Sequence, residues 1–528
     1  MEKQNKYSYL LLAIIIIAMA LRLPQLTQRP MHTDEAVHAI KFGELLEQGK
    51  YKYDSNEYHG PTLNYFTLIP AWISSSQTLT EINETTLRIV PVFFGLMLII
   101  LLLLLKDEMG KSATIFAALL TAISPAFVFY SRYYIQEMLL VCFTFGAIVA
   151  GFRYSKNKNI KWALLTGLFV GLMHATKETC IITFGAMSLA ILLINFVGRK
   201  KTGAGFNFIK SINIWHILTM GAAAFLISAL FYSSFLTNFP GILDSFKTYT
   251  TYLYRAGHND LHIHPWYYYL QILIFYKISS GPIWSEILIV ILAIFGIVTL
   301  LTKREIHNAN IQFYRFIASY TIIMTLIYSI IPYKTPWSML SFLHGMILMA
   351  GLGAATITKL QTKSINRAFI ILLLTLGTFQ LSWQSYLANR KYDADPSNPY
   401  VYAHTSKDIF KITQRIKEVA QAAPDKKNTY IEVICPADDY WPLPWYLRSF
   451  PHIGWCKKVN FEIPPAPIII ASPVVETELI YKLYEIPPPG QKNLYLPLFD
   501  SYTELRPQVE LRGYVVKEIW DQYQQNNN

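Results

Sequence analysis

Two adjacent carboxylates, Asp34 and Glu35, follow directly after the first long apolar run of the chain. A carboxylate can take a proton from an attacking hydroxyl or amine, and it can also serve as a ligand for a metal ion. The residue pattern predicts a helix over 34–49 with Thr33 as its N-cap, which places Asp34 and His38 one turn apart on the same face. In the alternative interpretation, the two acids only complement the dipole of that helix.

Further charged residues stand in short polar segments between apolar runs. They are Arg132 and Glu137 in YSRYYIQE, Lys177 in HATKET, Arg255 in YRAGHND and Lys334 in PYKTPW. A cation in such a position can neutralise a phosphate, and the fork of an arginine suits two phosphate oxygens. One alternative is interfacial anchoring by tyrosines beside a snorkelling Arg132, which explains the tyrosines better than it explains Glu137. Another is a local ion pair between Lys177 and Glu178.

Three histidines lie close together in YRAGHNDLHIHPWYYYL: His258, His262 and His264. Imidazole nitrogens are common zinc ligands, and this cluster can offer two or three of them. Asp34 and His38 are the other candidate ligands. The spacing fits no well-specified metal motif, and histidines also form hydrogen bonds with phosphates and sugars. The sequence therefore allows a divalent metal ion or a metal-free site, and it indicates no other cofactor.

The elements that must position these residues are those of a membrane protein. Hydrophobic residues make up 53% of the 528 residues and charged residues 15%, against roughly 25% charged in soluble domains. Apolar runs of on the order of 20 residues, long enough to cross a bilayer, recur along the chain. They lie near 8–24, 87–105, 113–130, 137–153, 162–176, 179–197, 214–236, 285–302, 312–332, 337–356 and 367–386. An α-helical polytopic membrane protein with about eleven transmembrane helices is predicted.

The basic residues indicate the orientation of these helices. The first run has no small-x-small cleavage site, so it is interpreted as a signal anchor with a cytoplasmic N-terminus. Alternating the sides from there places the basic clusters in cytoplasmic loops. The clusters are Lys106/Lys111, Arg153/Lys156/Lys158/Lys161, Arg199/Lys200/Lys201/Lys210, Lys303/Arg304/Arg315 and Lys359/Lys363/Arg367. Because this distribution explains much of the net charge of +12, a nucleic-acid partner is set aside and a multi-pass protein of the plasma or inner membrane is predicted.

The same topology gathers the candidate residues on the extracytoplasmic side. A long first extracytoplasmic loop over 25–86 carries the acidic pair, and the odd number of spans places the C-terminal part of the chain on the same side. We therefore expect a transmembrane domain over 1–389 and a soluble extracytoplasmic α/β domain over 390–528.

The C-terminal part changes in character from the membrane region. It contains short β-rich runs, TYIEVIC at 429–435 and APIIIAS at 466–472, separated by proline-rich turns, which is typical of a small α/β domain. Two of the four cysteines, Cys435 and Cys456, lie in this domain. They could form a disulfide in an oxidising compartment.

Several sequence blocks together resemble a known superfamily. The blocks are TDEAVHA, YHGPTLNY, SRYYIQE, ATKET, GHNDLHIHPWYYYL and PYKTPW. With a first span followed by an acidic pair in a long outer loop, the chain resembles the GT-C superfamily of membrane glycosyltransferases, in its ArnT-like and protein O-mannosyltransferase-like branch. It is most similar to the flippase-activity-associated Agl23-like proteins. The resemblance covers the membrane region and does not extend to 390–528.

The resemblance implies transfer of a sugar from a polyprenyl-phosphate donor to an acceptor protein, glycolipid or glycan on the extracytoplasmic side. It gives Asp34 the role of general base or acceptor-binding residue, Glu35 that of the second acid, and Glu137 that of the acid in the second outer loop. The cations that would neutralise the leaving phosphate are Arg132, Lys177, Arg255 and Lys334. Tyr58, His59 and Trp337 complete the predicted substrate-binding set.

Two other functions are alternatives to that of an enzyme. A transporter or flippase-associated protein would handle lipid-linked sugars without chemistry, and a noncatalytic scaffold would bind through its outer domain. Inverted repeats and glycine- or proline-broken spans, which are typical of transporters, are not evident. The charges also cluster at one face instead of along a pathway.

Overall fold

The computed structural model describes residues 2–56, 59–202, 213–258, 262–302, 309–360, 363–488 and 490–527. Contacts divide the chain into two compact units. Unit 1 comprises Met1–Leu26, Glu44–Ser75 and Thr85–Tyr402, and unit 2 comprises Thr27–Gly43, Ser76–Glu84 and Ala403–Asn528. Unit 2 thus combines the C-terminal part of the chain with the segment that carries the acidic pair.

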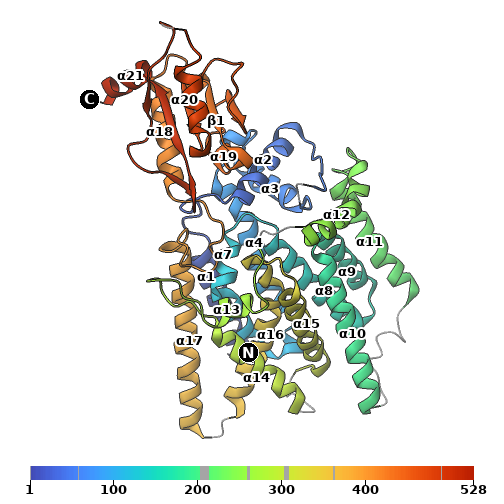
Figure 1. Cartoon of the computed structure of the whole chain (residues 1–528). Coiled ribbons are helices and arrows are strands. Elements are labelled where there is room, and N and C mark those ends of the chain that lie inside the picture. Colours follow the sequence, from blue (N-terminus) through green and yellow to red (C-terminus); the bar gives the residue numbers. More distant parts are fainter. Residues whose placement is uncertain are drawn as a thin grey trace. The chain divides into compact units, whose positions relative to one another are not determined.

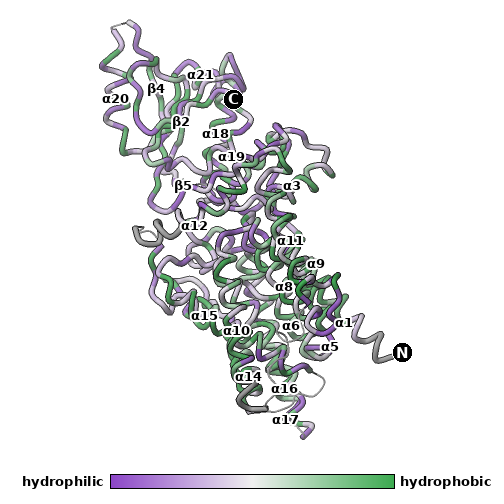
Figure 2. Tube along the Cα trace, turned by 90° about the vertical axis from the view of Figure 1, so that its right-hand side faces the viewer, coloured by the Kyte–Doolittle hydropathy of each residue, from purple (hydrophilic) through white to green (hydrophobic). Residues whose placement is uncertain are grey.

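Unit 1 is helical (Figure 1). Its helices are α1 (Glu2–Arg22), α3 (Thr62–Ile73), α4 (Glu84–Leu103), α5 (Lys106–Met109), α6 (Lys111–Ile123), α7 (Pro125–Ser131), α8 (Glu137–Asn157), α9 (Ile160–His174), α10 (Cys180–Thr202), α11 (Ile214–Tyr232), α12 (Pro240–His258), α13 (Tyr268–Ile274), α14 (Ile287–Thr302), α15 (Ile311–Ile330), α16 (Leu340–Leu360) and α17 (Ser364–Arg390). Hydrophobic residues predominate along α8, α9, α14 and α16, which Figure 2 shows in green.

All eleven predicted apolar runs lie on helices of unit 1. Among the described residues, six helices are long and apolar enough to cross a membrane, and four apolar helices of 10–17 residues are shorter. The remaining run is the pair α6 and α7, bent by 58°. The bend falls at Ser124, which caps α7 ahead of Pro125, because proline cannot continue the preceding helix. The predicted multi-pass helical fold is confirmed, while the number of crossings stays a prediction.

Close helix packing in unit 1 depends on small residues. Helices α14 and α16 meet where Gly296 and Gly353 face each other's backbone. A Cβ atom on Gly353 would lie 2.0 Å from the carbonyl oxygen of Leu292, and one on Gly296 would lie 2.3 Å from that of Met349. In a membrane, where lipid is as apolar as leucine, such close backbone contact is a main source of helix association.

Unit 2 contains a five-stranded sheet in the order β2-β1-β3-β7-β4, drawn in orange and red in Figure 1. The strands are β1 (Ile431–Ile434), β2 (Ile453–Cys456), β3 (Ile468–Ala471), β4 (Tyr495–Pro497) and β7 (Arg512–Val516), and β5 (Glu504–Arg506) pairs separately with β6 (Val509–Glu510). Strand β1 is parallel to β2 and β3, and β7 is antiparallel to β3 and β4. The two predicted β-rich runs became the central strands β1 and β3, which are wholly buried.

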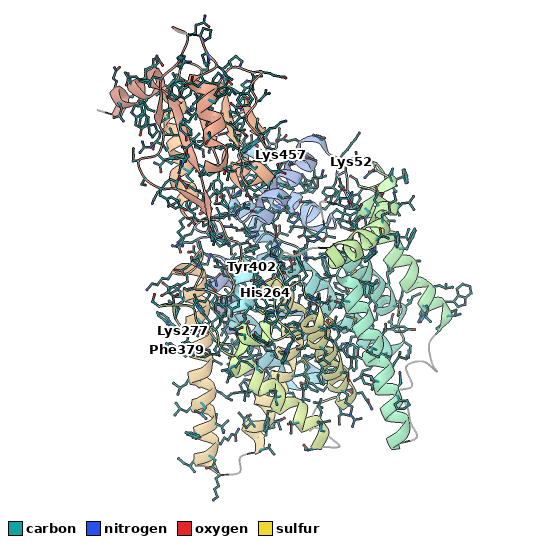
Figure 3. The ribbon with its side chains drawn as sticks, viewed as in Figure 1. Lys52, His264, Lys277, Phe379, Tyr402 and Lys457 are labelled. Atoms are coloured by element: carbon teal, nitrogen blue, oxygen red, sulfur yellow. The ribbon has the colours of Figure 1, made fainter. Side chains whose placement is uncertain are left out.

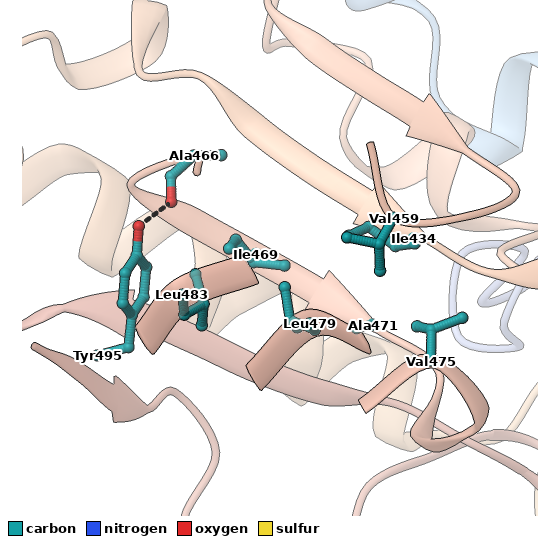
Figure 4. Packing of buried hydrophobic residues seen from close by; sticks show 9 residues of the cluster. All are labelled: Ile434, Val459, Ala466, Ile469, Ala471, Val475, Leu479, Leu483 and Tyr495. Atoms are coloured by element: carbon teal, nitrogen blue, oxygen red, sulfur yellow. Dashed lines mark hydrogen bonds between the residues drawn. The ribbon is translucent and has the colours of Figure 1, made fainter. Parts of the chain in front are cut away.

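The helices of unit 2 are the first part of α2 (Thr33–Gln48), α18 (Asp408–Ala422), α19 (Leu443–Tyr446), α20 (Glu476–Tyr484) and α21 (Lys517–Asn527). Leu479 and Leu483 of α20 pack on Ile469 of β3, as Figure 4 shows. At the edge of this core, the hydroxyl of Tyr495 donates to the carbonyl oxygen of Ala466 at 2.9 Å. The predicted α/β character of this region is therefore confirmed.

The two cysteines of unit 2 are free thiols. Cys456 pairs in register with Ile434, so its side chain shares a face with that residue. Cys435 is the next residue along β1 and therefore points to the opposite face, although its N–H donates to the carbonyl oxygen of Cys456 at 2.9 Å. A disulfide would require a shift of register.

Candidate functional site

The acidic pair lies in the first turn of α2, where its two members have different environments. The carboxylate of Glu35 is fully buried, contacts Arg29 at 3.2 Å and accepts the N–H of His32 at 3.1 Å. It thereby satisfies a backbone donor at the helix start, as an acid at this position of a capping box does. The side chain of Asp34 is 45% exposed. Of this acidic pair, only Asp34 presents its carboxylate to solvent.

The N-cap of α2 is His32 and not Thr33, so the predicted cap was wrong. The helix begins at Thr33, and the N–H of Asp34 donates to Nδ1 of His32 at 3.1 Å. Because Nδ1 accepts a hydrogen bond, its ring is neutral with the proton on Nε2. Burial lowers the pKa of His32 below its ordinary 6.5, against the pull of the nearby acids, which agrees with a neutral cap.

The segment before α2 is held against the C-terminal part of unit 2. The N–H of Met31 donates to the hydroxyl of Tyr446 at 2.8 Å, and the hydroxyl of Thr405 donates to the carbonyl oxygen of Met31 at 2.7 Å. The hydroxyl of Thr33 accepts from Arg506 at 3.0 Å. Asp34 is therefore presented from a backbone that is fixed from several sides.

In unit 1, four charged or titratable side chains form a buried centre around the turn between α9 and α10. Lys177 contacts Glu137, the first residue of α8, and Glu178 contacts Nδ1 of His59 at 3.0 Å. The predicted local pair between Lys177 and Glu178 is thus replaced by two contacts with distant segments. We call Glu137, Lys177, Glu178 and His59 the α9–α10 centre.

The α9–α10 centre exists because two loops dock on each other. The N–H of Thr62 donates to the carbonyl oxygen of Ala175 at 3.2 Å, and the hydroxyls of Thr62 and Thr176 are 2.8 Å apart. A Cβ atom on Gly60 would lie 2.2 Å from that same Ala175 oxygen. Only glycine fits this approach, which brings the neighbouring His59 to Glu178.

Charges within the α9–α10 centre compensate one another. Burial alone would raise the pKa of Glu178, but His59 and Lys177 lower it to about 2. Burial alone would lower the pKa of Lys177, but Glu137 and Glu178 raise it above its ordinary value. Both groups are therefore charged at neutral pH.

The side chain of Arg132, a predicted phosphate ligand, is bound by backbone carbonyl groups. Its guanidinium donates to the carbonyl oxygens of Arg22 and Pro24, each at 2.8 Å, and to that of Gln25 at 3.1 Å. These are the last residue of α1 and the residues that follow it. Arg132 thus satisfies carbonyl groups that the end of a helix leaves without partners.

A second polar cluster in unit 1 joins the histidine loop to the turn before α16. The backbones of Ile263 and Tyr333 pair as an antiparallel bridge. Nδ1 of His262 lies 2.6 Å and Nε2 of His264 lies 3.1 Å from the hydroxyl of Tyr402. Figure 3 labels His264 and Tyr402, which lie side by side. We call His262, His264, Lys334, Trp337 and Tyr402 the Lys334 cluster.

Lys334 is only 1% exposed. Its ammonium group donates to the carbonyl oxygens of Ile331 and, at 3.3 Å, His264. Among the described residues it forms no ion pair. Burial lowers its pKa, and the positive Lys334 in turn lowers the pKa of His264, after burial and His262. The ring of Trp337 lies 6.0 Å from that of Tyr402.

The predicted metal ligands do not converge within the described part of the chain. There, no group of three or more histidine, cysteine, aspartate or glutamate side chains could hold a metal ion. His262 and His264 meet at a tyrosine hydroxyl instead, and His38 is buried in α2. Tyr58 lies outside the described residues, as do the side chains of Arg255 and His258 in α12.

Two residues of these sites did not emerge from the sequence. Tyr402 lies in a stretch that the charge pattern assigned to the C-terminal domain, and Arg506 lies in a short strand without a recognisable motif. Their partners are 138 and 473 residues away. Neither spacing leaves a local signal, so only homologous sequences that co-vary could have indicated these contacts.

The chain was compared with known proteins. Residues 67–232, from α3 to the end of α11, match a family model described as dolichyl-phosphate-mannose-protein mannosyltransferase. The comparison with curated proteins gave no match. ArnT from Cupriavidus metallidurans, solved with bound undecaprenyl phosphate, is similar with a TM-score of 0.61 and 12% identity, over 95% of this chain and 97% of ArnT.

The oligosaccharyltransferase of Archaeoglobus fulgidus, tethered with an acceptor peptide, is similar with a TM-score of 0.56 and 12% identity. The match covers 91% of this chain and 70% of the oligosaccharyltransferase. At these identities the likeness shows the fold. The chain has the fold that its resemblance to the GT-C superfamily predicted, which ArnT and the oligosaccharyltransferase share. The narrower Agl23-like resemblance stays a prediction.

Proposed function

We propose that this protein transfers a sugar from a polyprenyl-phosphate donor to an acceptor on the extracytoplasmic side of the plasma membrane. The match to ArnT supports this proposal, because it spans nearly all of both chains and the ArnT structure holds undecaprenyl phosphate. The oligosaccharyltransferase structure with its acceptor peptide provides a second precedent for an acceptor. The family model names a lipid-phosphate mannose donor.

The observation that carries the proposal is the burial of Lys334, which forms no ion pair with a carboxylate among the residues that the structure describes. A buried cation is costly unless an opposite charge compensates it. The phosphate of a lipid-linked sugar would supply that charge. We therefore assign the donor phosphate to Lys334, with the histidine ring that does not donate to Tyr402 as a further hydrogen-bond donor and the ring of Trp337 as an apolar wall.

Asp34 is proposed as the general base. Transfer requires removal of a proton from the acceptor hydroxyl or amine as it attacks the anomeric carbon, and a carboxylate that is open to solvent can accept it. The bond from the anomeric carbon to the phosphate oxygen then breaks, and the phosphate leaves with the electron pair of that bond. Glu35 has the supporting role of fixing the turn that presents Asp34.

The other predicted cations fit this reaction less well. Lys177 is already compensated by Glu137, and Arg132 is engaged by carbonyl oxygens at the end of α1. We propose that both residues support the fold around the site. No step is assigned to a metal ion, because the described donor groups do not form a suitable ligand set.

Lipid binding tests the role of Lys334. Purified full-length protein in nanodiscs should be stabilised against heat by undecaprenyl phosphate more than by undecaprenol, because only the first lipid carries the anion. Lys334→Met should remove this difference and weaken binding by about tenfold or more, which corresponds to about 1.4 kcal/mol. Lys277→Met, which changes an exposed lysine, is the matched control. Equal stabilisation by both lipids would refute the assignment.

Transfer itself tests the role of Asp34. Asp34→Asn should lower transfer of the sugar from labelled polyprenyl-phosphate donors in native membranes by about 10²- to 10⁴-fold. The melting temperature and the binding of undecaprenyl phosphate should stay as in the wild type, since the side chain is exposed. Undiminished transfer with a folded variant would exclude a catalytic role for Asp34. Absence of transfer by the wild type would favour the noncatalytic alternative.

A further inference from the structure

A residue of the C-terminal part of unit 2 reaches the first turn of α2. Arg506, at the end of β5, donates through one terminal nitrogen to the hydroxyl of Thr33 at 3.0 Å and through the other to Asp439 at 2.7 Å. Thr33 is the residue next to Asp34. Arg506 thus joins the start of α2 to the loop that follows β1.

The hairpin that carries Arg506 is firmly held. Leu505 is fully buried, and its carbonyl oxygen accepts the N–H of Ser406 at 2.8 Å. The N–H of Glu504 donates to Asp408 at 3.3 Å, and β6 pairs with β5. Because side chains alternate along a strand, burial of Leu505 turns the guanidinium of Arg506 to the opposite side. The arginine is therefore presented from a rigid support.

The partner loop is also constrained. Asp439 follows Ala437 and Asp438, which both have left-handed backbone conformations with φ of 56° and 60°. Such conformations are uncommon outside glycine and persist only where the surroundings impose them. Lys457, which directly follows β2, forms an ion pair with Asp438 at 2.8 Å. The carboxylate of Asp439 is thus held where the arginine fork can bind it.

We propose that Arg506 is a positioning residue for Asp34, through which the C-terminal part of unit 2 sets the orientation of the base. This inference rests on the proposed role of Asp34. The guanidinium of Arg506 donates to the hydroxyl of Thr33 with one nitrogen and to the carboxylate of Asp439 with the other. These contacts restrain rotation of the first turn of α2 relative to the sheet. Fixing a reacting group in this way raises the rate without tightening substrate binding.

Paired variants separate this role from a general effect on the fold. Arg506→Gln and Thr33→Val each remove the contact, while Thr33→Ser keeps the hydroxyl. Arg415→Gln is the control, because it removes another ion pair of the same unit, with Asp500 at 2.8 Å. Each variant would be prepared as the full chain in nanodiscs.

The first readout is chemical and does not depend on activity. Carbodiimide with glycine ethyl ester labels exposed carboxylates, and mass spectrometry gives the rate at Asp34 relative to other peptides. Loosening the first turn should raise that rate about threefold or more in Arg506→Gln and Thr33→Val. Thr33→Ser and Arg415→Gln should match the wild type. Unchanged labelling of Asp34 in Arg506→Gln would overturn the inference, even if its melting temperature fell.

The second readout is turnover of the labelled polyprenyl-phosphate donor. Both disruptive variants should lower kcat by about tenfold with KM unchanged. The double variant should be no worse than either single variant, because both substitutions remove the same contact between Arg506 and Thr33. Additive losses would contradict a shared contact. If the wild type shows no transfer at all, the proposed function fails, and the labelling experiment still decides whether Arg506 orients Asp34.

Discussion

Lys177 and Lys334 are two buried lysines in short turns of unit 1, and they differ in what surrounds the charge. Lys177 contacts the carboxylate of Glu137, whereas Lys334 donates only to carbonyl oxygens among the described residues. Burial alone would lower the pKa of both, but the acids around Lys177 raise its pKa, while that of Lys334 stays lowered. The first charge is compensated by the protein itself. For the second, the described part of the chain supplies no carboxylate, and the proposed donor phosphate would provide the compensating charge.

Removing the two charges should affect stability differently, and this is the largest of the expected effects. Lys177→Met leaves the buried Glu137 without its partner and should lower the free energy of unfolding by about 3–5 kcal/mol. Lys334→Met removes a buried charge that has carbonyl partners but no carboxylate partner among the described residues, and it should leave stability unchanged or slightly higher. Thermal unfolding in detergent without added lipid measures both. Equal destabilisation by the two substitutions would break the comparison.

Acid pH should affect the surroundings of Lys177 specifically. The pKa of Glu178 is lowered from 4.5 to about 2, so its contribution to stability is complete above pH 4.5 and is lost as the pH falls toward 2. The loss amounts to on the order of 3 kcal/mol. Glu178→Gln should therefore show a flatter melting-temperature profile between pH 5 and 3, whereas Lys334→Met should follow the wild type. If Glu178→Gln has the same melting-temperature profile as the wild type, other acidic residues cause the loss of stability at low pH.

Alkaline pH should change the contributions of the two lysines to stability differently. This is the smallest of the three expected effects. The lowered pKa of Lys334 means that the folded state loses this proton before the unfolded state does, so stability rises with pH below 10.5. The raised pKa of Lys177 means that its contribution stays constant up to 10.5 and is lost only above it. Between pH 8 and 10, wild type should gain stability relative to Lys334→Met. Its difference from Lys177→Met should stay constant.

The fold was predictable where the signal is local. Apolar runs of span length became the helices of unit 1, and the two β-rich runs became β1 and β3, because each pattern acts through neighbours in sequence. The acidic pair was correctly placed at a helix start. The difference in exposure between Asp34 and Glu35 could not be predicted, because it depends on the burial of Glu35 against Arg29 and on His32 as the cap.

The rest of the site depends on contacts between distant residues. Arg132 looks like a phosphate ligand in sequence, yet carbonyl groups at the end of α1, over 100 residues away, occupy its guanidinium. The histidine cluster looks like a metal site, yet two of its rings meet at Tyr402, which is 138 residues or more away. Thr33 looks like a cap, yet its hydroxyl is taken by Arg506. No periodicity or spacing encodes such pairings.

The hydroxyl of Tyr402 has one proton to share between two rings. It lies 2.6 Å from Nδ1 of His262 and 3.1 Å from Nε2 of His264, so if it donates to one ring, the other ring must donate to it. The chain of hydrogen bonds therefore has a direction, and turning the hydroxyl with a change of tautomer reverses it without moving a heavy atom. A charge that binds near one histidine can therefore change the protonated nitrogen of the other, through the hydroxyl of Tyr402.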